Sequence, residues 1–123
     1  MTYNIHTLPN GLRIIHAPNQ SAVAYCGFAV DAGTRDEADN EQGMAHFVEH
    51  LLFKGTKKRH AWHILNRMEH VGGDLNAYTN KEETIVYSAF LAEHFPRAVE
   101  LLSDIVFHST FPQHEIDKEV EVI

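Results

Sequence analysis

The sequence predicts an α+β fold, in which a mixed or antiparallel β-sheet is covered by helices. Short segments bounded by turn residues indicate strands, and apolar segments that end at glycine indicate helices. The two kinds of segment interleave without the regular βαβ repetition of a parallel sheet. With 123 residues, of which 44% are hydrophobic and 22% charged, the chain suits one globular domain or part of one.

Strands are expected in three regions of the chain. A hairpin spans residues 2–17, because Pro9-Asn10-Gly11 forms a strong turn signal between two short apolar segments. Residues 22–30 are small and apolar, which predicts a buried strand, and the polar residues 31–42 predict a surface loop. The alternating segments 74–79 and 83–91 predict two further strands.

Four helices are expected from apolar periodicity and from capping residues. They are predicted over residues 42–54, 61–71, 94–108 and 113–123. Gly55 and Gly72-Gly73 stand where the first two helices should end, and Pro96 is compatible with the first turn of the third. The last helix keeps its apolar period up to Ile123, so the sequence is expected to stop within a helix.

Composition excludes several classes of function. The formal net charge of -7 argues against a nucleic-acid-binding protein, and Cys26 as the single cysteine excludes a disulfide framework. No membrane span is expected, because the longest apolar run, 22–30, is far shorter than the roughly 20 residues that a spanning helix needs. Without a signal peptide in the sequence, a soluble, cytoplasmic protein is the default expectation.

The motif with recognisable chemistry is H-x-x-E-H in the first predicted helix. At about 100° per residue, His46, Glu49 and His50 fall on one stripe of that helix. The apolar residues occupy the opposite side; they are Met44, Phe47, Val48, Leu51 and Leu52. One face is therefore available for packing, while the other presents two imidazoles and a carboxylate.

This arrangement is typical of a zinc hydrolase. Imidazoles at positions i and i+4 can bind one Zn²⁺ at about 2.0–2.1 Å, and a catalytic site adds a third protein ligand and a water. Glu49 would then act as the general base for that water, whose pKa the metal lowers towards about 7. The alternative is a solvated face of an amphipathic helix, and the motif alone does not supply the third ligand.

The segment GMAHFVEHLLFKGT, residues 43–56, resembles the active-site segment of the M16 zinc metallopeptidases. This family includes pitrilysin, insulin-degrading enzyme and the mitochondrial processing peptidase. Other segments are similar to the family in the same order, and together they cover nearly the whole chain. They are residues 8–13, 32–37, 72–79, 82–87 and 111–123.

The resemblance implies that residues 1–123 are a partial N-terminal catalytic domain, a half-domain of the LuxS/MPP-like metallohydrolase type. The family's third zinc ligand is a glutamate that would fall at about position 126, after the last residue of this sequence. A partial site of this kind is expected to be inactive alone. Val120 is one departure, because the family often has arginine there.

The resemblance also implies roles for residues around the metal. Glu119 precedes the expected third ligand by about two helical turns and would orient the site from the same helix face. Glu82 could orient a zinc-binding histidine, or it could be an exposed loop residue. The strand at Asn76, Ala77 and Tyr78 would border the cleft and pair with an extended substrate; alternatively, these are ordinary strand residues near a turn.

The function implied is that of a Zn²⁺-dependent metalloendopeptidase with peptide substrates. The family also implies a C-terminal half or a homologous partner domain or subunit, and so a possible homo- or heterodimer. A first alternative is a non-catalytic structural or partner subunit of the same fold, although His46, Glu49 and His50 are all present here. A second alternative is an unrelated zinc-binding domain.

Overall fold

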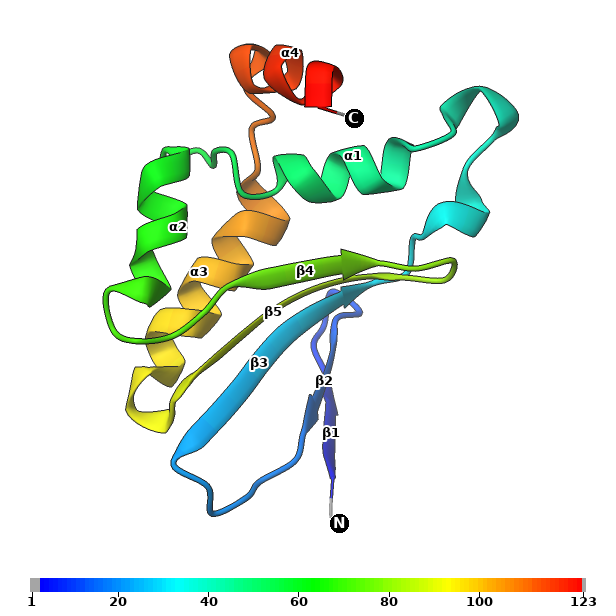
Figure 1. Cartoon of the computed structure of the whole chain (residues 1–123). Helices are drawn as coiled ribbons and strands as arrows, with labels where there is room; N and C mark the ends of the chain where they lie inside the picture. The colour runs from blue at the N-terminus through cyan, green and yellow to red at the C-terminus, as the bar shows by residue number, and fades with distance from the viewer. Residues whose placement is uncertain (1–2, 123) are drawn as a thin grey trace.

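In a computed structural model that describes residues 3–122, and side chains to residue 120, helices pack on a three-stranded antiparallel sheet (Figure 1). The expected α+β class with an antiparallel sheet is therefore confirmed. The strands are β1 (Asn4–Thr7), β2 (Arg13–His16), β3 (Val23–Val30), β4 (Asn76–Thr79) and β5 (Thr84–Leu91). The helices are α1 (Met44–Leu51), α2 (Ala61–Glu69), α3 (Phe95–His108) and α4 (Gln113–Val122). Three single 3₁₀ turns lie at Thr34–Asp36, Asp39–Glu41 and Ala92–His94.

The strand order of the main sheet is β3-β5-β4, so β5 lies in the centre and β4 forms an edge. Thr79 of β4 lies opposite Thr84 of β5, and Cys26 of β3 lies opposite Ser88. The strands β1 and β2 pair only with each other within the described residues, as the predicted hairpin. No helix in residues 3–122 has both the length and the apolar character required to cross a bilayer.

The core lies between one face of the sheet and the helices α2 and α3. Alternate residues of β5 point into it, and helix residues close it from the other side. Its buried members are Leu52, Ile64, Met68, Val86, Phe90, Ala98, Leu101, Leu102 and Ile105. This single cluster is the packed surface on which the elements of the candidate site rest.

The strand predicted to be buried at 22–30 is instead half exposed. Residues of β3 alternate between the core and the opposite face, and Tyr25 on that face is 71% exposed. The prediction was wrong about burial because an unbroken apolar run does not reveal whether one face or both faces of a strand are covered.

The first helix is shorter than predicted over 42–54, because α1 spans only Met44–Leu51. Gly55 does not cap it; Gly55 pairs in a β-bridge with His60, and its carbonyl accepts the N–H of Thr110 at 3.1 Å. Tertiary pairing therefore ends the helix early. By contrast, Gly72 follows α2 with a φ of 78°, in the left-handed region that favours glycine after a helix.

Other boundaries differ by a few residues. The strand expected to start at 74 starts at Asn76, and the predicted loop 31–42 contains two of the 3₁₀ turns. Pro96 lies in the first turn of α3, as expected. The helix predicted over 113–123 is observed as α4 up to Val122, and Ile123 lies outside the described residues.

The loop before α1 is anchored on the turn between β4 and β5. Thr34 N–H donates to the Asn80 carbonyl at 3.0 Å, and Arg35 N–H donates to the Lys81 carbonyl at 3.0 Å. Gly33 permits this approach, because a Cβ atom there would lie only 2.6 Å from the Lys81 carbonyl carbon. The start of α1 is thereby placed near the end of β4.

A cluster of charged and polar side chains joins the loop after α1 to α3. Arg59 donates to Asp104 Oδ2 at 2.7 Å and to Glu100 Oε2 at 3.0 Å, and Thr56 Oγ1 donates to Asp104 Oδ2 at 2.6 Å. Lys58 Nζ lies 2.8 Å from Glu100 Oε2. The pKa of Glu100 is lowered from 4.5 to about 2, mainly because Arg59 donates hydrogen bonds to its carboxylate.

This shift predicts a pH-dependent contribution of Glu100 to stability. Because its pKa is lower in the folded state, the stabilisation is complete above about pH 4.5 and is lost as the pH falls towards 2. We expect Glu100→Gln to unfold at lower urea than wild type near neutral pH, with a gap that narrows as the pH falls. Glu69→Gln, which changes an exposed carboxylate on α2, is the control, and a gap independent of pH would contradict the prediction.

Core packing gives a second prediction. Leu102 on α3 is fully buried, whereas Leu91 at the end of β5 is 46% exposed. Leu102→Ala should lower the free energy of unfolding by about 2–5 kcal/mol, since it removes buried methyl groups and leaves a cavity. Leu91→Ala should cost about 1 kcal/mol or less in the same denaturant titration. Equal losses would show that the core is not where the structure places it.

Candidate metal centre

The helix α1 carries the H-x-x-E-H motif, and its first turn is fixed by a residue from the preceding loop. Gly43 starts the helix with a φ of 88°. Glu37 accepts hydrogen bonds from Ala45 N–H at 2.7 Å and from Gly43 N–H at 3.3 Å. A carboxylate at a helix N-terminus satisfies free N–H groups and interacts favourably with the helix dipole. Sequence reasoning missed Glu37, because no capping pattern places a cap so far before the helix.

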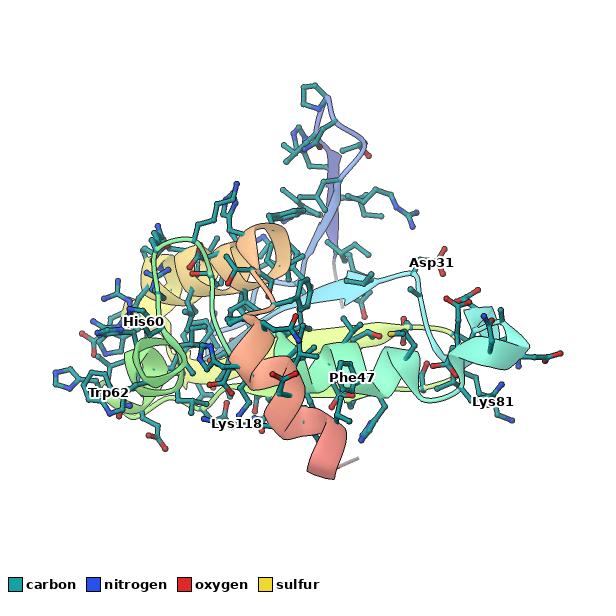
Figure 2. The ribbon with its side chains drawn as sticks, turned by 90° about the horizontal axis from the view of Figure 1, so that it is seen from above. Asp31, Phe47, His60, Trp62, Lys81 and Lys118 are labelled. Carbon is teal, nitrogen blue, oxygen red and sulfur yellow. The ribbon has the colours of Figure 1, made fainter. Side chains whose placement is uncertain are left out.

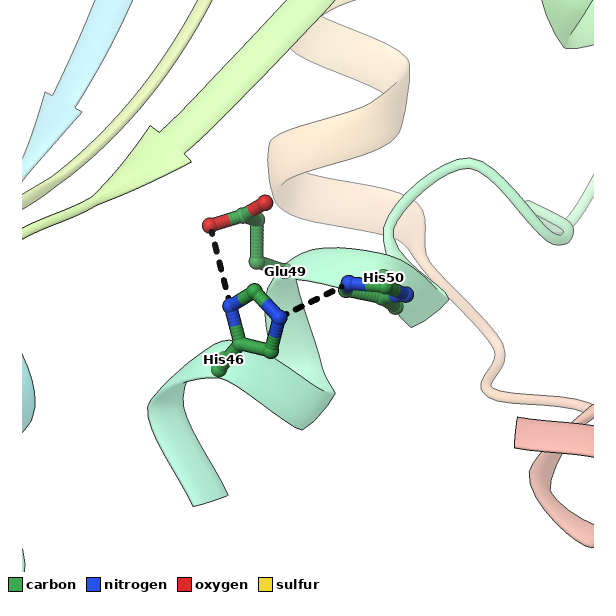
Figure 3. Close-up of side chains that lie close together, drawn as sticks. All are labelled: His46, Glu49 and His50. Atoms are coloured by element: carbon green, nitrogen blue, oxygen red, sulfur yellow. Dashed lines mark hydrogen bonds and ion pairs between the residues drawn. The ribbon is translucent and has the colours of Figure 1, made fainter. Parts of the chain in front are cut away.

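The two imidazoles of the motif face each other on α1 (Figure 3). The Nε2 atoms of His46 and His50 are 3.0 Å apart. Two nitrogens bound to one tetrahedral Zn²⁺ at 2.0–2.1 Å would be separated by about 3.3 Å. The observed pair therefore fits a shared metal ion with very little movement of either ring.

His50 is oriented by a carboxylate from the far end of the chain. Glu119 on α4 lies with Oε2 at 3.0 Å from His50 Nδ1. Because a carboxylate only accepts hydrogen bonds, Nδ1 carries the proton, and the lone pair of the neutral ring is on Nε2. That nitrogen points at His46, so the tautomer suits metal binding. Glu119 follows His50 by 69 residues in the sequence, and the fold brings the two side chains into contact.

The helix α4 lies across α1 and is attached to it by charge (Figure 2). Lys54, just after α1, places Nζ 3.6 Å from Glu119 Oε1 and 4.0 Å from Glu115 Oε2. The side chain of Glu119 is only 10% exposed, so the lysine compensates part of the cost of burying its charge. Sequence reasoning assigned no such role to Lys54, since only the tertiary structure brings α4 to it.

Glu49 occupies the side of α1 that faces the sheet. Its carboxylate accepts a hydrogen bond from Thr79 Oγ1 at 2.6 Å, and the same oxygen lies 4.0 Å from His46 Nδ1. The side chain is 14% exposed. A carboxylate, two imidazoles and a strand hydroxyl therefore meet where α1 passes over β4.

Within the part of the chain that the structure describes, His46, Glu49 and His50 form the group of side chains suited to a metal ion. Their ligand atoms all lie within 4.8 Å of one another. A surface hollow of about 290 Å³ opens beside them, and it is lined by Glu49, His50, Phe53, Lys54, Leu65 and Glu119.

Glu82 does not join this group. It forms an ion pair with Arg35 on the surface, and its side chain is 62% exposed. Among the described residues it has no hydrogen bond or ion pair with either imidazole. The alternative of an exposed loop residue therefore describes Glu82 better than a role in orienting a histidine, because the turn after β4 carries it away from α1.

The open edge of β4 lies next to the motif. Asn80 N–H, directly after β4, donates to the Glu83 carbonyl at 2.9 Å. In an antiparallel ladder, only every second residue of an edge strand forms main-chain hydrogen bonds with the adjacent strand. The main-chain groups of Tyr78 and Asn76 therefore bond to β5. The N–H and C=O of Ala77 point to the other side, where no strand of the described residues lies.

The side chains of β4 alternate between two faces. Thr79 contacts Glu49 on the side of α1, whereas Tyr78 packs edge-to-face with Tyr87 at a centroid distance of 6.1 Å. Asn76 lies opposite Tyr87 and shares that second face. The side chains of Asn76 and Tyr78 therefore do not point at Glu49, and Ala77 contributes its main chain.

A comparison with known families agrees with this geometry. The family model described as insulinase (peptidase family M16) matches residues 13–123. The chain belongs to the M16 peptidase family. The match includes the H-x-x-E-H helix, β4 and α4, which are the elements that build the candidate metal centre.

Individual M16 relatives resemble the chain over almost its full length. The mitochondrial-processing peptidase subunit beta of Bos taurus is 43% identical over 94% of this chain, which is 24% of that relative. An uncharacterized zinc protease of Rickettsia bellii is 42% identical over 98% of this chain and 30% of the relative. A protease structure from Helicobacter pylori superposes with a TM-score of 0.94 at 26% identity, over 98% of this chain and 30% of that one. The chain thus spans about a quarter to a third of these relatives.

The contact between Glu119 and His50 predicts a selective effect on zinc affinity. Glu119→Gln, in the full-length protein, should weaken zinc binding by about 10- to 100-fold, because His50 loses the carboxylate that fixes its tautomer. Glu115→Gln is the matched control, since Glu115 also lies on α4 and near Lys54 but has no hydrogen bond to His50. Competition with a chromophoric chelator measures both affinities, and equal weakening would argue against the proposed role of Glu119.

Proposed function

We propose that the protein is a zinc-dependent endopeptidase that hydrolyses peptide bonds within extended peptides. The observation that carries this proposal is the pair of Nε2 atoms 3.0 Å apart with the Glu49 carboxylate beside them. Membership of a peptidase family, and a relative named as a zinc protease, support it.

In this proposal, His46 and His50 hold the metal through their Nε2 atoms. A glutamate at about position 126 of the full-length protein would be the third ligand. When bound, zinc supplies a Lewis acid that polarises the scissile carbonyl and makes a water more acidic. The donor set suits zinc, because two imidazoles and carboxylate oxygen are among its usual protein ligands.

Glu49 is the proposed general base. Its carboxylate lies beside both imidazoles without a cation of its own among the described residues, so it can accept a proton from the attacking water. The protonated carboxyl can then donate that proton to the amine as the peptide bond breaks. One side chain would thus act first as a base and then as an acid.

The open edge of β4 is the proposed place for the substrate. An extended peptide can add to a free strand edge through main-chain hydrogen bonds, which demand little of its sequence. Ala77 offers an outward N–H and C=O for such pairing. A side-chain contact from Asn76 or Tyr78 stays a prediction, and it would have to reach the peptide from the opposite face of the strand.

We further propose that the active protein includes a second half or a partner subunit. The relative from Bos taurus is, by its name, one subunit of a peptidase, and this chain matches only 24% of it. Residues 1–123 alone would then lack the third ligand and part of the substrate cleft. The isolated segment is accordingly expected to be inactive, whether the full assembly is a homodimer or a heterodimer.

The decisive test removes the base and keeps the metal ligands. In the full-length protein, Glu49→Gln should retain zinc and lose about 100- to 10,000-fold in kcat on an unstructured, fluorogenic peptide, because general acid–base catalysis is abolished. Glu69→Gln, an exposed glutamate on α2, is the control and should cleave like wild type.

The other outcomes separate the alternatives. If wild type binds zinc but neither form cleaves, even with a partner half added, the chain is a non-catalytic subunit. If neither form binds zinc, the assignment of His46 and His50 as ligands is wrong. Cleavage by Glu49→Gln at the wild-type rate would remove Glu49 from the mechanism.

A further inference from the structure

The Glu49 carboxylate has one hydroxyl partner, and it comes from the strand rather than from the helix. Thr79 Oγ1 donates to Glu49 Oε1 at 2.6 Å, across 30 residues of sequence. A hydroxyl bonded to an ionised carboxylate at this distance makes one of the stronger hydrogen bonds in proteins. Its effect is to fix which way Glu49 points.

Without this bond, α1 would leave the carboxylate poorly defined. A glutamate side chain has three rotatable torsions, and ordering it costs conformational entropy. The nearest imidazole nitrogen, His46 Nδ1, is 4.0 Å away, which is beyond hydrogen-bond range. The strand hydroxyl is therefore the contact that selects the position of the carboxylate.

Thr79 is itself well fixed. Its side chain is β-branched, which restricts χ1, and it belongs to a strand paired in register with β5. Thr84 lies directly opposite, with the two Oγ1 atoms 3.4 Å apart, and Thr84 donates its own proton to the Ala32 carbonyl at 2.8 Å. Because a carboxylate only accepts hydrogen bonds and the contact to Glu49 is the shorter of the two, Thr79 donates its proton to Glu49.

We propose that Thr79 is a positioning residue that holds the Glu49 carboxylate beside the open edge of β4. This inference rests on the proposed function. Ala77 and Thr79 are two residues apart on one strand, about 6.6–6.8 Å along its axis. The strand that would pair with the substrate therefore also sets the position of the general base. As a result, β4 defines both the register of the bound peptide and the position of the Glu49 carboxylate.

The test compares three variants of the full-length, zinc-loaded protein. Thr79→Val keeps the β-branched shape and removes the hydroxyl, and it should lower kcat by about 10- to 100-fold with KM within about twofold. Thr79→Ser restores the hydroxyl and should recover most of kcat. Ser88→Ala is the control, because it removes a different strand hydroxyl, which is buried and donates to the Asp74 carbonyl away from Glu49.

Two readouts other than turnover accompany the kinetics. Zinc content should equal that of wild type in both Thr79→Val and Ser88→Ala, and a crystal structure of Thr79→Val should show the Glu49 carboxylate turned away from β4. Wild-type kcat in Thr79→Val, or failure of Thr79→Ser to recover activity, would overturn the inference while the peptidase proposal stands. A wild-type protein that cleaves no peptide would instead refute the proposed function.

Discussion

The candidate site depends on how α1 is fixed between two elements that are distant in sequence. On one side, Glu49 accepts a hydrogen bond from the Thr79 hydroxyl of β4. On the other side, His50 is hydrogen-bonded to Glu119 of α4. An amphipathic helix of eight residues has little stability alone, so its position comes from tertiary contacts. These two hydrogen bonds also fix the orientations of the Glu49 and His50 side chains. The contacts that hold α1 in place therefore also position its functional groups.

Basic side chains offset the free-energy cost of burying carboxylates around α1 in this acidic protein. Lys54 lies beside Glu115 and Glu119, and Arg59 lies between Glu100 and Asp104. Each cation follows α1 closely and faces a helix from the C-terminal part of the chain. Burying several carboxylates without such partners would cost free energy. Lys54 and Arg59 therefore connect the segment after α1 to helices α4 and α3, respectively.

Sequence reasoning located the elements well and misjudged their environment. The glycines and prolines predicted most boundaries, because backbone conformations at turns and caps are local properties. It failed where tertiary pairing decides the outcome: Gly55 forms a β-bridge with His60 instead of capping α1, and one face of β3 remains exposed. It left two alternatives open for Glu82, an orienting residue or an exposed loop residue, and only the fold shows that Glu82 pairs with Arg35 whereas Glu119 reaches His50.

The sequence by itself determined the chemistry available to this protein: His46, Glu49 and His50 fall on one helix face because 3.6 residues make a turn. It also determined the M16 family, through motifs spread over most of the chain. Only the tertiary structure decided which groups support those residues. The hydroxyl of Thr79 and the carboxylate of Glu37 reach α1 only through the tertiary fold, because long-range contacts leave no periodic signal in a sequence. For Glu119, the family resemblance predicted a place beside the site, and the structure added its contact with His50.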